Sequence, residues 1–158
     1  MAVPSPEPHR VATPALAAAR GSRRGQRLSH TARVALAVEI LAAYAHARRS
    51  LRRAPIASVV AGLRSQSPSA APPTADSLAE ARRLGRAVTR LLVHIPGDTR
   101  CLARSLVLTR LLAKRSIQAK LVIGARPDPE FLAHAWVEHA GDPVLDPGDD
   151  SFGRLVEL

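Results

Sequence analysis

Residues 98–113 read DTRCLARSLVLTRLLA, and this stretch decides the fold. Asp98 or Thr99 can cap a helix here, because a short polar side chain accepts hydrogen bonds from the free amides of a first turn. The apolar body that follows, residues 102–112, predicts a buried central helix and not a surface one. Cys101, the one cysteine of the chain, would lie in the first turn of this helix, at its exposed end.

Other helices are expected on the N-terminal side. One begins near Ser29 or Thr31 and runs to about Leu51, because apolar residues recur there at three- and four-residue spacing. Pro55 then ends it, and residues 56–63 suggest a short second helix. The residues expected to form the buried face of the first helix are Val34, Leu36, Ala37, Ile40, Leu41, Tyr44 and Ala45.

Residues 65–75 are rich in serine and proline and are expected to form a linker. Asp76 or Ser77 is expected to cap the next helix, which runs to about Val93, and Ser77 with Glu80 matches the reciprocal capping pattern.

Strands are expected after residue 115. Residues 119–123 form a short apolar run that ends at Gly124, and residues 125–130 are a turn rich in proline and acidic residues. Residues 132–139 alternate, so that His134, Trp136 and Glu138 share one face. A turn at Gly141-Asp142 leads into a third short strand, residues 144–146. Helices followed by an antiparallel sheet make an α+β fold.

A nucleophile, a base and an orienting group can be assembled from these elements. Free amides and the positive dipole end at a helix start stabilise a thiolate, which favours Cys101 as nucleophile. His134 can take the thiol proton, and Asp146, on the next strand, can orient its ring. Each residue also has a structural interpretation: a buried inert cysteine, a histidine bonded to the backbone, and an aspartate in a turn.

Composition excludes several other chemistries. A single cysteine forms no internal disulfide and no zinc cluster of several thiolates. His134 and His139 would face opposite sides of their strand, so no metal site is expected, and without a glycine-rich phosphate loop no cofactor is expected either. The first thirty residues lack the apolar core of a secretory signal, and residues 34–47 are too short to span a bilayer. We therefore expect a cytoplasmic protein without a membrane span.

The net charge of +10 lies in the N-terminal part of the chain. Residues 31–65 carry six basic side chains and one acidic one, whereas residues 101–158 carry seven basic and eight acidic side chains. Such a basic surface can bind nucleic acid or an acidic peptide. No aromatic side chains interleave with the arginines, so nucleic acid is not the expected partner.

The motifs around these three residues resemble one family. The stretches CLARSLVLTRLL at 101–112, AKLVIG at 119–124, AHAWVE at 133–138 and LD at 145–146 resemble the leader peptidases of lasso-peptide biosynthesis. That family belongs to the transglutaminase-like group of cysteine proteases, with a papain-like core. The turn after the helix reads Ser116-Ile117-Gln118 here, where that family often has Gly-Ile-Pro.

The resemblance implies a nucleophile at Cys101, a general base and acid at His134 and an orienting group at Asp146. It implies cleavage of the leader from a ribosomally made precursor peptide, before a macrolactam-forming cyclase closes the ring. Residues 1–28 are too short for the precursor-recognition domain that some members carry, so the chain is expected to be the standalone protease half of a split maturation protein. It would then need a separate small leader-recognition protein.

Two other functions stay open. The same triad could pass its acyl group to an amine, as a transglutaminase-like acyltransferase does. Alternatively, the chain is a non-catalytic basic adaptor that binds a peptide or nucleic acid. The expected organisation is a disordered basic tail (1–28), an N-terminal helical region with its linker (29–75) and a protease core (76–158), the last two forming one compact domain.

Overall fold

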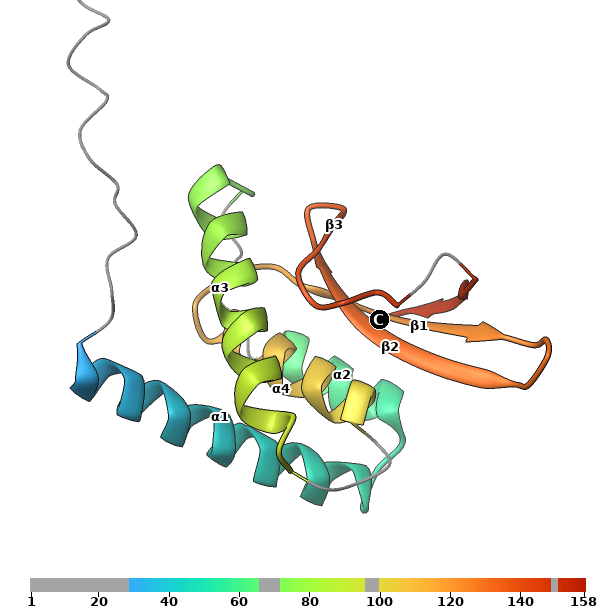
Figure 1. Cartoon of the computed structure of the whole chain (residues 1–158), viewed down its shortest axis with the longest axis horizontal. Helices are drawn as coiled ribbons and strands as arrows, with labels where there is room; N and C mark the ends of the chain where they lie inside the picture. The colour runs from blue at the N-terminus through green and yellow to red at the C-terminus, as the bar shows by residue number, and fades with distance from the viewer. Residues whose placement is uncertain (1–28, 66–71, 96–99, 149–150) are drawn as a thin grey trace, which may run out of the picture.

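Four helices precede a four-stranded antiparallel sheet in the computed structural model of the chain (Figure 1). The structure describes residues 29–65, 72–95, 100–148 and 151–158. The elements are α1 (His30–Leu51), α2 (Ile56–Ser65), α3 (Ala75–Leu92), α4 (Arg100–Ala113), β1 (Lys120–Arg126), β2 (Leu132–His139), β3 (Asp142–Pro143) and β4 (Gly153–Glu157). The predicted α+β class is confirmed.

The predicted tail at residues 1–28, most of the linker and the candidate caps Asp98 and Thr99 lie outside the described residues.

The first helix begins where the sequence predicts. Ser29 is the N-cap of α1, and its hydroxyl accepts a hydrogen bond from the Ala32 amide at 3.2 Å. Its buried residues are Ile40, Ala43 and Ala47. The broader apolar face predicted for this helix is wrong at Val34, Leu41 and Ala45, which are exposed. Small alanines at the contact leave only a narrow stripe of α1 in the core.

The third helix begins earlier than predicted. Its N-cap is Thr74, not Asp76 or Ser77, and its hydroxyl accepts from the Ser77 amide at 3.1 Å. The Ser77 hydroxyl in turn accepts from the Thr74 amide at 2.9 Å. Ser77 therefore belongs to a reciprocal capping pair, but as its third helical residue, while Glu80 pairs with Arg83 instead.

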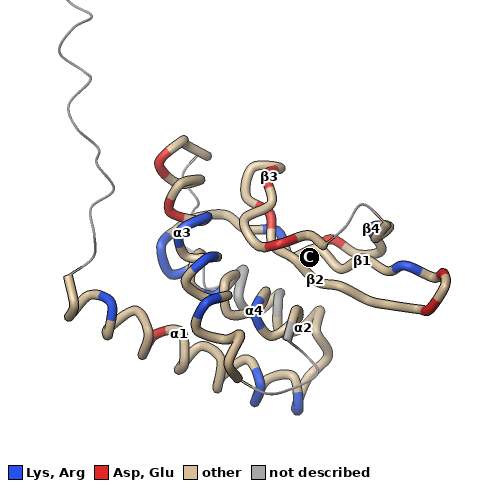
Figure 2. The backbone as a smooth tube through the Cα atoms, in the orientation of Figure 1, with Lys and Arg blue, Asp and Glu red and all other residues tan. Residues whose placement is uncertain are grey.

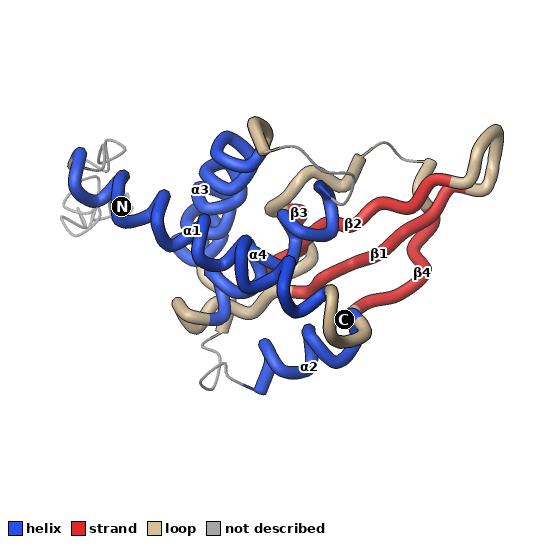
Figure 3. Tube along the Cα trace, turned by 90° about the horizontal axis from the view of Figure 1, so that it is seen from below, coloured by secondary structure: helices blue, strands red, loops and turns tan. Residues whose placement is uncertain are grey.

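Helix α4 is the centre of the molecule. It packs against α1, α2 and α3 on the helical side and against β1 and β2 on the sheet side (Figures 1 and 3). Leu106, Leu108, Leu111 and Leu112 are at most 1% exposed, which confirms the predicted buried central helix. Burying each such leucine contributes about 1.5–3 kcal/mol relative to exposure. The core therefore holds the helix that carries Cys101.

The sheet has the order β3-β2-β1-β4. Strand β2 has the predicted bounds, but β1 continues through Gly124 to Arg126. This position of β1 requires glycine, because the Trp136 ring and the Gly153 carbonyl fill the space of a side chain; a Cβ there would lie 2.8 Å from Trp136 Cζ3.

The end of the chain departs further from the prediction. The third strand is Asp142–Pro143, reached by a tight turn with positive φ at Ala140 and Gly141, so the strand predicted at 144–146 is wrong. The tight turn aligns residues 142–143 with β2, and the chain leaves the sheet after them. Strand β4, which pairs with β1, was not predicted. None of the described helices is long and apolar enough to cross a bilayer.

Candidate active site

Helix α4 presents Cys101 near its first residue. The helix begins at Arg100 and Cys101 is half-buried with a free thiol. The Cys101 amide is among the first four of the helix, which have no carbonyl partner within it. These amides and the dipole end favour negative charge at this point, on a sulfur anion or on a developing oxyanion.

A hydrogen bond ties this helix to the strand that carries His134. The hydroxyl of Ser105, one turn after Cys101 and on the same side of the helix, donates to the Ala135 carbonyl at 2.9 Å. Ser105 is completely buried, so this bond is shielded from water. It fixes the first turns of α4 beside the backbone next to His134. Among the described residues, neither the Cys101 sulfur nor His134 Nδ1 forms a hydrogen bond.

The ring of His134 has a defined orientation. Its Nε2 lies 3.0 Å from the main-chain carbonyl oxygen of Asp146. Because a carbonyl oxygen only accepts, Nε2 must carry the proton, and in the neutral ring Nδ1 then keeps the lone pair. The half-buried ring therefore offers its basic nitrogen on the side away from Asp146.

Asp146 meets the histidine through its backbone. Sequence reasoning anticipated a carboxylate at the second ring nitrogen, but the atom found there is the carbonyl oxygen. The carboxylate instead accepts a hydrogen bond from the Gly148 amide at 3.0 Å, which forms an Asx turn. Asp146 lies in the loop after β3 and not in a strand, and this loop position points its carbonyl at the ring.

Two aromatic side chains pack near the His134 ring. Trp136 is stacked with His134 at a centroid distance of 6.2 Å, which agrees with their predicted common face. Phe152 lies at 5.3 Å, tilted by 40°. A side chain at Gly148 would meet Phe152 at 3.1 Å and His134 at 3.4 Å, so this loop needs glycine to approach the ring. Sequence reasoning missed Phe152 and Gly148; the only signal was an aromatic residue four positions after a Pro-Gly turn.

Glu138 supports the tryptophan. Its side chain is buried, and the residue is only 6% exposed. Its carboxylate accepts from Trp136 Nε1 at 2.9 Å and from the Arg154 guanidinium at 2.6 Å. Because Arg154 sits on β4, the unpredicted strand supplies the cation that allows this carboxylate to be buried.

Arg104 lies close to Cys101 in the sequence, whereas His139 is the last residue of β2. Arg104, three residues after Cys101, is half-buried, and its Nε has no hydrogen-bond partner among the described residues. His139 is 2% exposed and bonds to Gln118 O at 2.7 Å and to Ser77 Oγ at 2.8 Å. These bonds occupy both ring nitrogens, so His139 is structural: it ties the start of α3 to the end of β2.

The sequence model of the transglutaminase-like superfamily matches residues 40–157, well over half of the chain. The chain belongs to this superfamily. A curated relative is the Microcin J25-processing protein McjB of Escherichia coli, which is 48% identical to this chain over 60 residues. That alignment covers 37% of this chain and 28% of McjB, so the match spans under a third of the relative's length. No solved structure matches the chain.

The transglutaminase-like match includes α4 and the whole sheet, and so contains Cys101, His134 and Asp146. Their assignment as a catalytic triad stays a prediction.

Proposed function

We propose that this chain is a cysteine peptidase that removes the leader from a ribosomally synthesised lasso-peptide precursor. Membership of the transglutaminase-like superfamily supports a cysteine-dependent acyl transfer, and the partial similarity to a protein named for processing microcin J25 supports a peptide substrate. The observation that carries the proposal is the Ser105–Ala135 hydrogen bond, which joins the start of the cysteine helix to the histidine strand.

In the proposed reaction, His134 Nδ1 takes the proton of the Cys101 thiol, and the sulfur attacks the scissile carbonyl carbon. The carbonyl π electrons move to oxygen, which accepts a hydrogen bond from the Cys101 amide. Collapse of this intermediate breaks the C–N bond, and the imidazolium returns its proton to the leaving amine. Water, deprotonated by the same nitrogen, then hydrolyses the thioester and frees the thiol. Asp146 keeps the ring in the required tautomer.

The proposed partners are the precursor peptide and a separate small leader-recognition protein. A macrolactam-forming cyclase would use the freed amine, and the reaction would take place in the cytoplasm. We propose that residues 29–75 fold with the core at 76–158 as one domain and that residues 1–28 form a basic tail.

The test is mass spectrometry of a candidate precursor mixed with the protein and the recognition protein. Two product masses that sum to the precursor plus one water are expected. Cys101→Ala and His134→Ala should each abolish cleavage while circular dichroism stays unchanged. His94→Ala is the matched control and should cleave normally, because His94 is exposed and lies after the end of α3, outside the helix that carries Cys101 and the strand that carries His134. Full cleavage by the Cys101→Ala protein would rule the proposal out.

A transglutaminase-like acyltransferase is the second candidate, because the superfamily match applies equally to it. The same spectra separate the two reactions. Transfer to an amine yields a cross-linked product with loss of ammonia or of the leaving peptide, whereas hydrolysis yields free fragments only. An unreactive mixture in which the protein still binds the precursor would favour the non-catalytic adaptor.

A further inference from the structure

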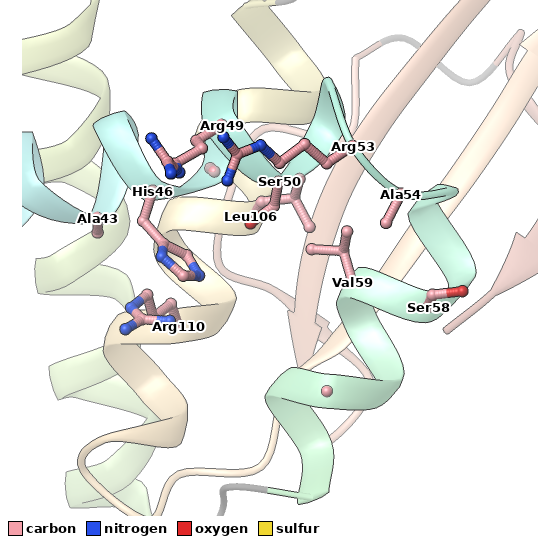
Figure 4. Close-up of a pocket in the computed structure, with 12 residues that line it drawn as sticks. Ala43, His46, Arg49, Ser50, Arg53, Ala54, Ser58, Val59, Leu106 and Arg110 are labelled. Atoms are coloured by element: carbon pink, nitrogen blue, oxygen red, sulfur yellow. The ribbon is translucent and has the colours of Figure 1, made fainter.

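A basic pocket lies on the helical side of the molecule, between α1, α2 and α4 (Figure 4). Its volume is about 380 Å³, within the range of about 300–1,000 Å³ typical of ligand sites. Leu106, which lines the pocket, belongs to α4. Arg110, also on α4, is nine residues after Cys101, which is two and a half helical turns. The pocket therefore opens on the face of α4 opposite the candidate active site.

Four cationic or titratable side chains converge on this pocket. His46, Arg49 and Arg53 come from α1 and the residues after it, and Arg110 comes from α4. In Figure 4 His46 points from α1 toward Arg110. His46, Arg49 and Arg53 are exposed, whereas Arg110 is half-buried. The positive charge thus extends from the rim of the pocket to its wall.

No acidic side chain of the described residues pairs with these arginines or with His46. The pKa of His46 is lowered by partial desolvation and by the positive charge of Arg110. Arg49 and Arg110 each lie in the last turn of a helix, which the helix dipole favours. The cations of α1 and α4 repel one another, and the helix dipoles do not explain why they converge on the same pocket.

We propose that this pocket binds an acidic peptide segment, with one carboxylate on Arg110 and another on Arg49. Guanidinium groups form two parallel hydrogen bonds with a carboxylate, and such pairs are strongest where water is partly excluded. Charges spread over two helices suit carboxylates spaced along a chain better than one compact phosphate. None of the described lining residues is phenylalanine, tyrosine or tryptophan, so the pocket lacks the large aromatic side chains on which nucleic-acid bases commonly stack.

Fluorescence anisotropy of a short poly-glutamate peptide carrying a neutral dye tests this site on the full chain. Arg49→Gln and Arg110→Gln should each weaken binding by roughly tenfold or more, as loss of a charge-assisted pair implies. Arg49 is exposed, so its variant should fold even if the Arg110 variant does not. The matched control is Arg33→Gln, an equal charge change at an exposed site of α1 outside the pocket, which should change affinity less than about twofold.

Competition experiments distinguish other anions. A poly-glutamine peptide of equal length should not bind. Inorganic phosphate should compete only weakly, and single-stranded DNA should bind no better to the native protein than to Arg110→Gln. The proposal is overturned if Arg33→Gln weakens peptide binding as much as Arg49→Gln, since the attraction would then be a general effect of net charge. It is also overturned if phosphate or DNA binds this pocket in preference to the peptide.

Discussion

At the residue scale, the orientation of His134 depends on a loop. The Asp146 carbonyl fixes the protonated nitrogen, and the Asp146 carboxylate fixes the loop by accepting from the Gly148 amide. The two atoms of one residue therefore do different work. In a serine-protease triad the carboxylate itself contacts the imidazole, and its replacement by an amide changes the tautomer. Here the acceptor at the ring is the main-chain carbonyl of Asp146, which remains when the side-chain carboxylate is replaced by an amide.

This geometry predicts unequal effects of two substitutions. Asp146→Asn keeps an oxygen acceptor for the Gly148 amide and keeps the main-chain carbonyl, so kcat/KM for precursor cleavage should fall by less than about tenfold. Asp146→Ala removes the Asx turn and should lower kcat/KM further. If Asp146→Asn is as inactive as His134→Ala, the carboxylate and not the carbonyl orients the ring during catalysis.

At the element scale, the turn after α4 has backbone strain at a serine. Ser116 has a φ of 57°, in the left-handed region that favours glycine. The amide of Ile117 donates to the Leu112 carbonyl at 3.0 Å, and that of Ser116 to Ala113 at 3.0 Å, which is the hydrogen-bond pattern of a Schellman cap. Serine thus stands where the resembled family often has glycine.

Ser116→Gly should therefore stabilise the protein, by about 1 kcal/mol, because glycine adopts this conformation without a Cβ clash. Urea unfolding measures the difference. Gln118→Gly is the matched control, since Gln118 lies outside the left-handed region and should lose stability from added backbone freedom. A Ser116→Gly protein that is less stable than the native one would contradict this account of the turn.

A second element-scale prediction concerns the contact of α3 with the loop that leads to Asp146. A Cβ at Gly85 would overlap the Val144 carbonyl oxygen, a backbone atom that cannot rotate away. Gly85→Ala should push this loop off α3, destabilise the fold by about 1–3 kcal/mol and displace Asp146 from His134. Gly62→Ala is the control, because a Cβ at Gly62 meets nothing within 4 Å. Equal stability of the two alanine variants would contradict the close packing at Gly85.

The elements differ in how far the sequence could predict them. Helix α1 and strand β2 have local signals, a serine cap and strict alternation, and their bounds were predicted. Strand β4 has none: all five of its residues are exposed, and it forms only because β1 offers an edge to pair with. Sequence spacing could nominate His134 and Asp146, but only the loop conformation determines which oxygen of Asp146 faces the ring.

At the scale of the whole molecule, basic side chains are most frequent on the helices. Lysines and arginines predominate on the helices, with acidic segments on α1 and at the start of α3, and acidic residues also lie at the β1–β2 turn and around β3 (Figure 2). One ion-pair network joins three helical elements. Glu39 on α1 lies 2.7 Å from Arg115, just after α4, and Arg115 lies 3.9 Å from Glu80 on α3.

This network predicts a pH dependence of stability. The hydrogen bond from Arg115 is the largest cause that lowers the pKa of Glu39, and the charges of Arg115 and Lys114 add to it. A folded-state pKa below the unfolded one stabilises the protein above the unfolded value, near 4.5, and this stabilisation is lost as the pH falls through the folded value. Glu39→Gln should therefore cost about 0.5–1 kcal/mol at neutral pH and little in acid.

Urea unfolding of both proteins across the acidic range measures this difference. Asp128→Asn, an exposed substitution in the β1–β2 turn, serves as the control for removing one carboxylate. A Glu39→Gln difference that is the same at neutral and at acidic pH would exclude an electrostatic origin.

The central claim is that His134 takes the proton of Cys101, and the rate at which iodoacetamide alkylates Cys101 tests it most directly, because it needs no substrate or partner. With His134 present, Cys101 should react near neutral pH faster than free cysteine, and the His134→Ala protein should react at least about tenfold more slowly than the native one. His94→Ala should leave the rate unchanged. Equal alkylation rates in the native and His134→Ala proteins across neutral pH would contradict the claim.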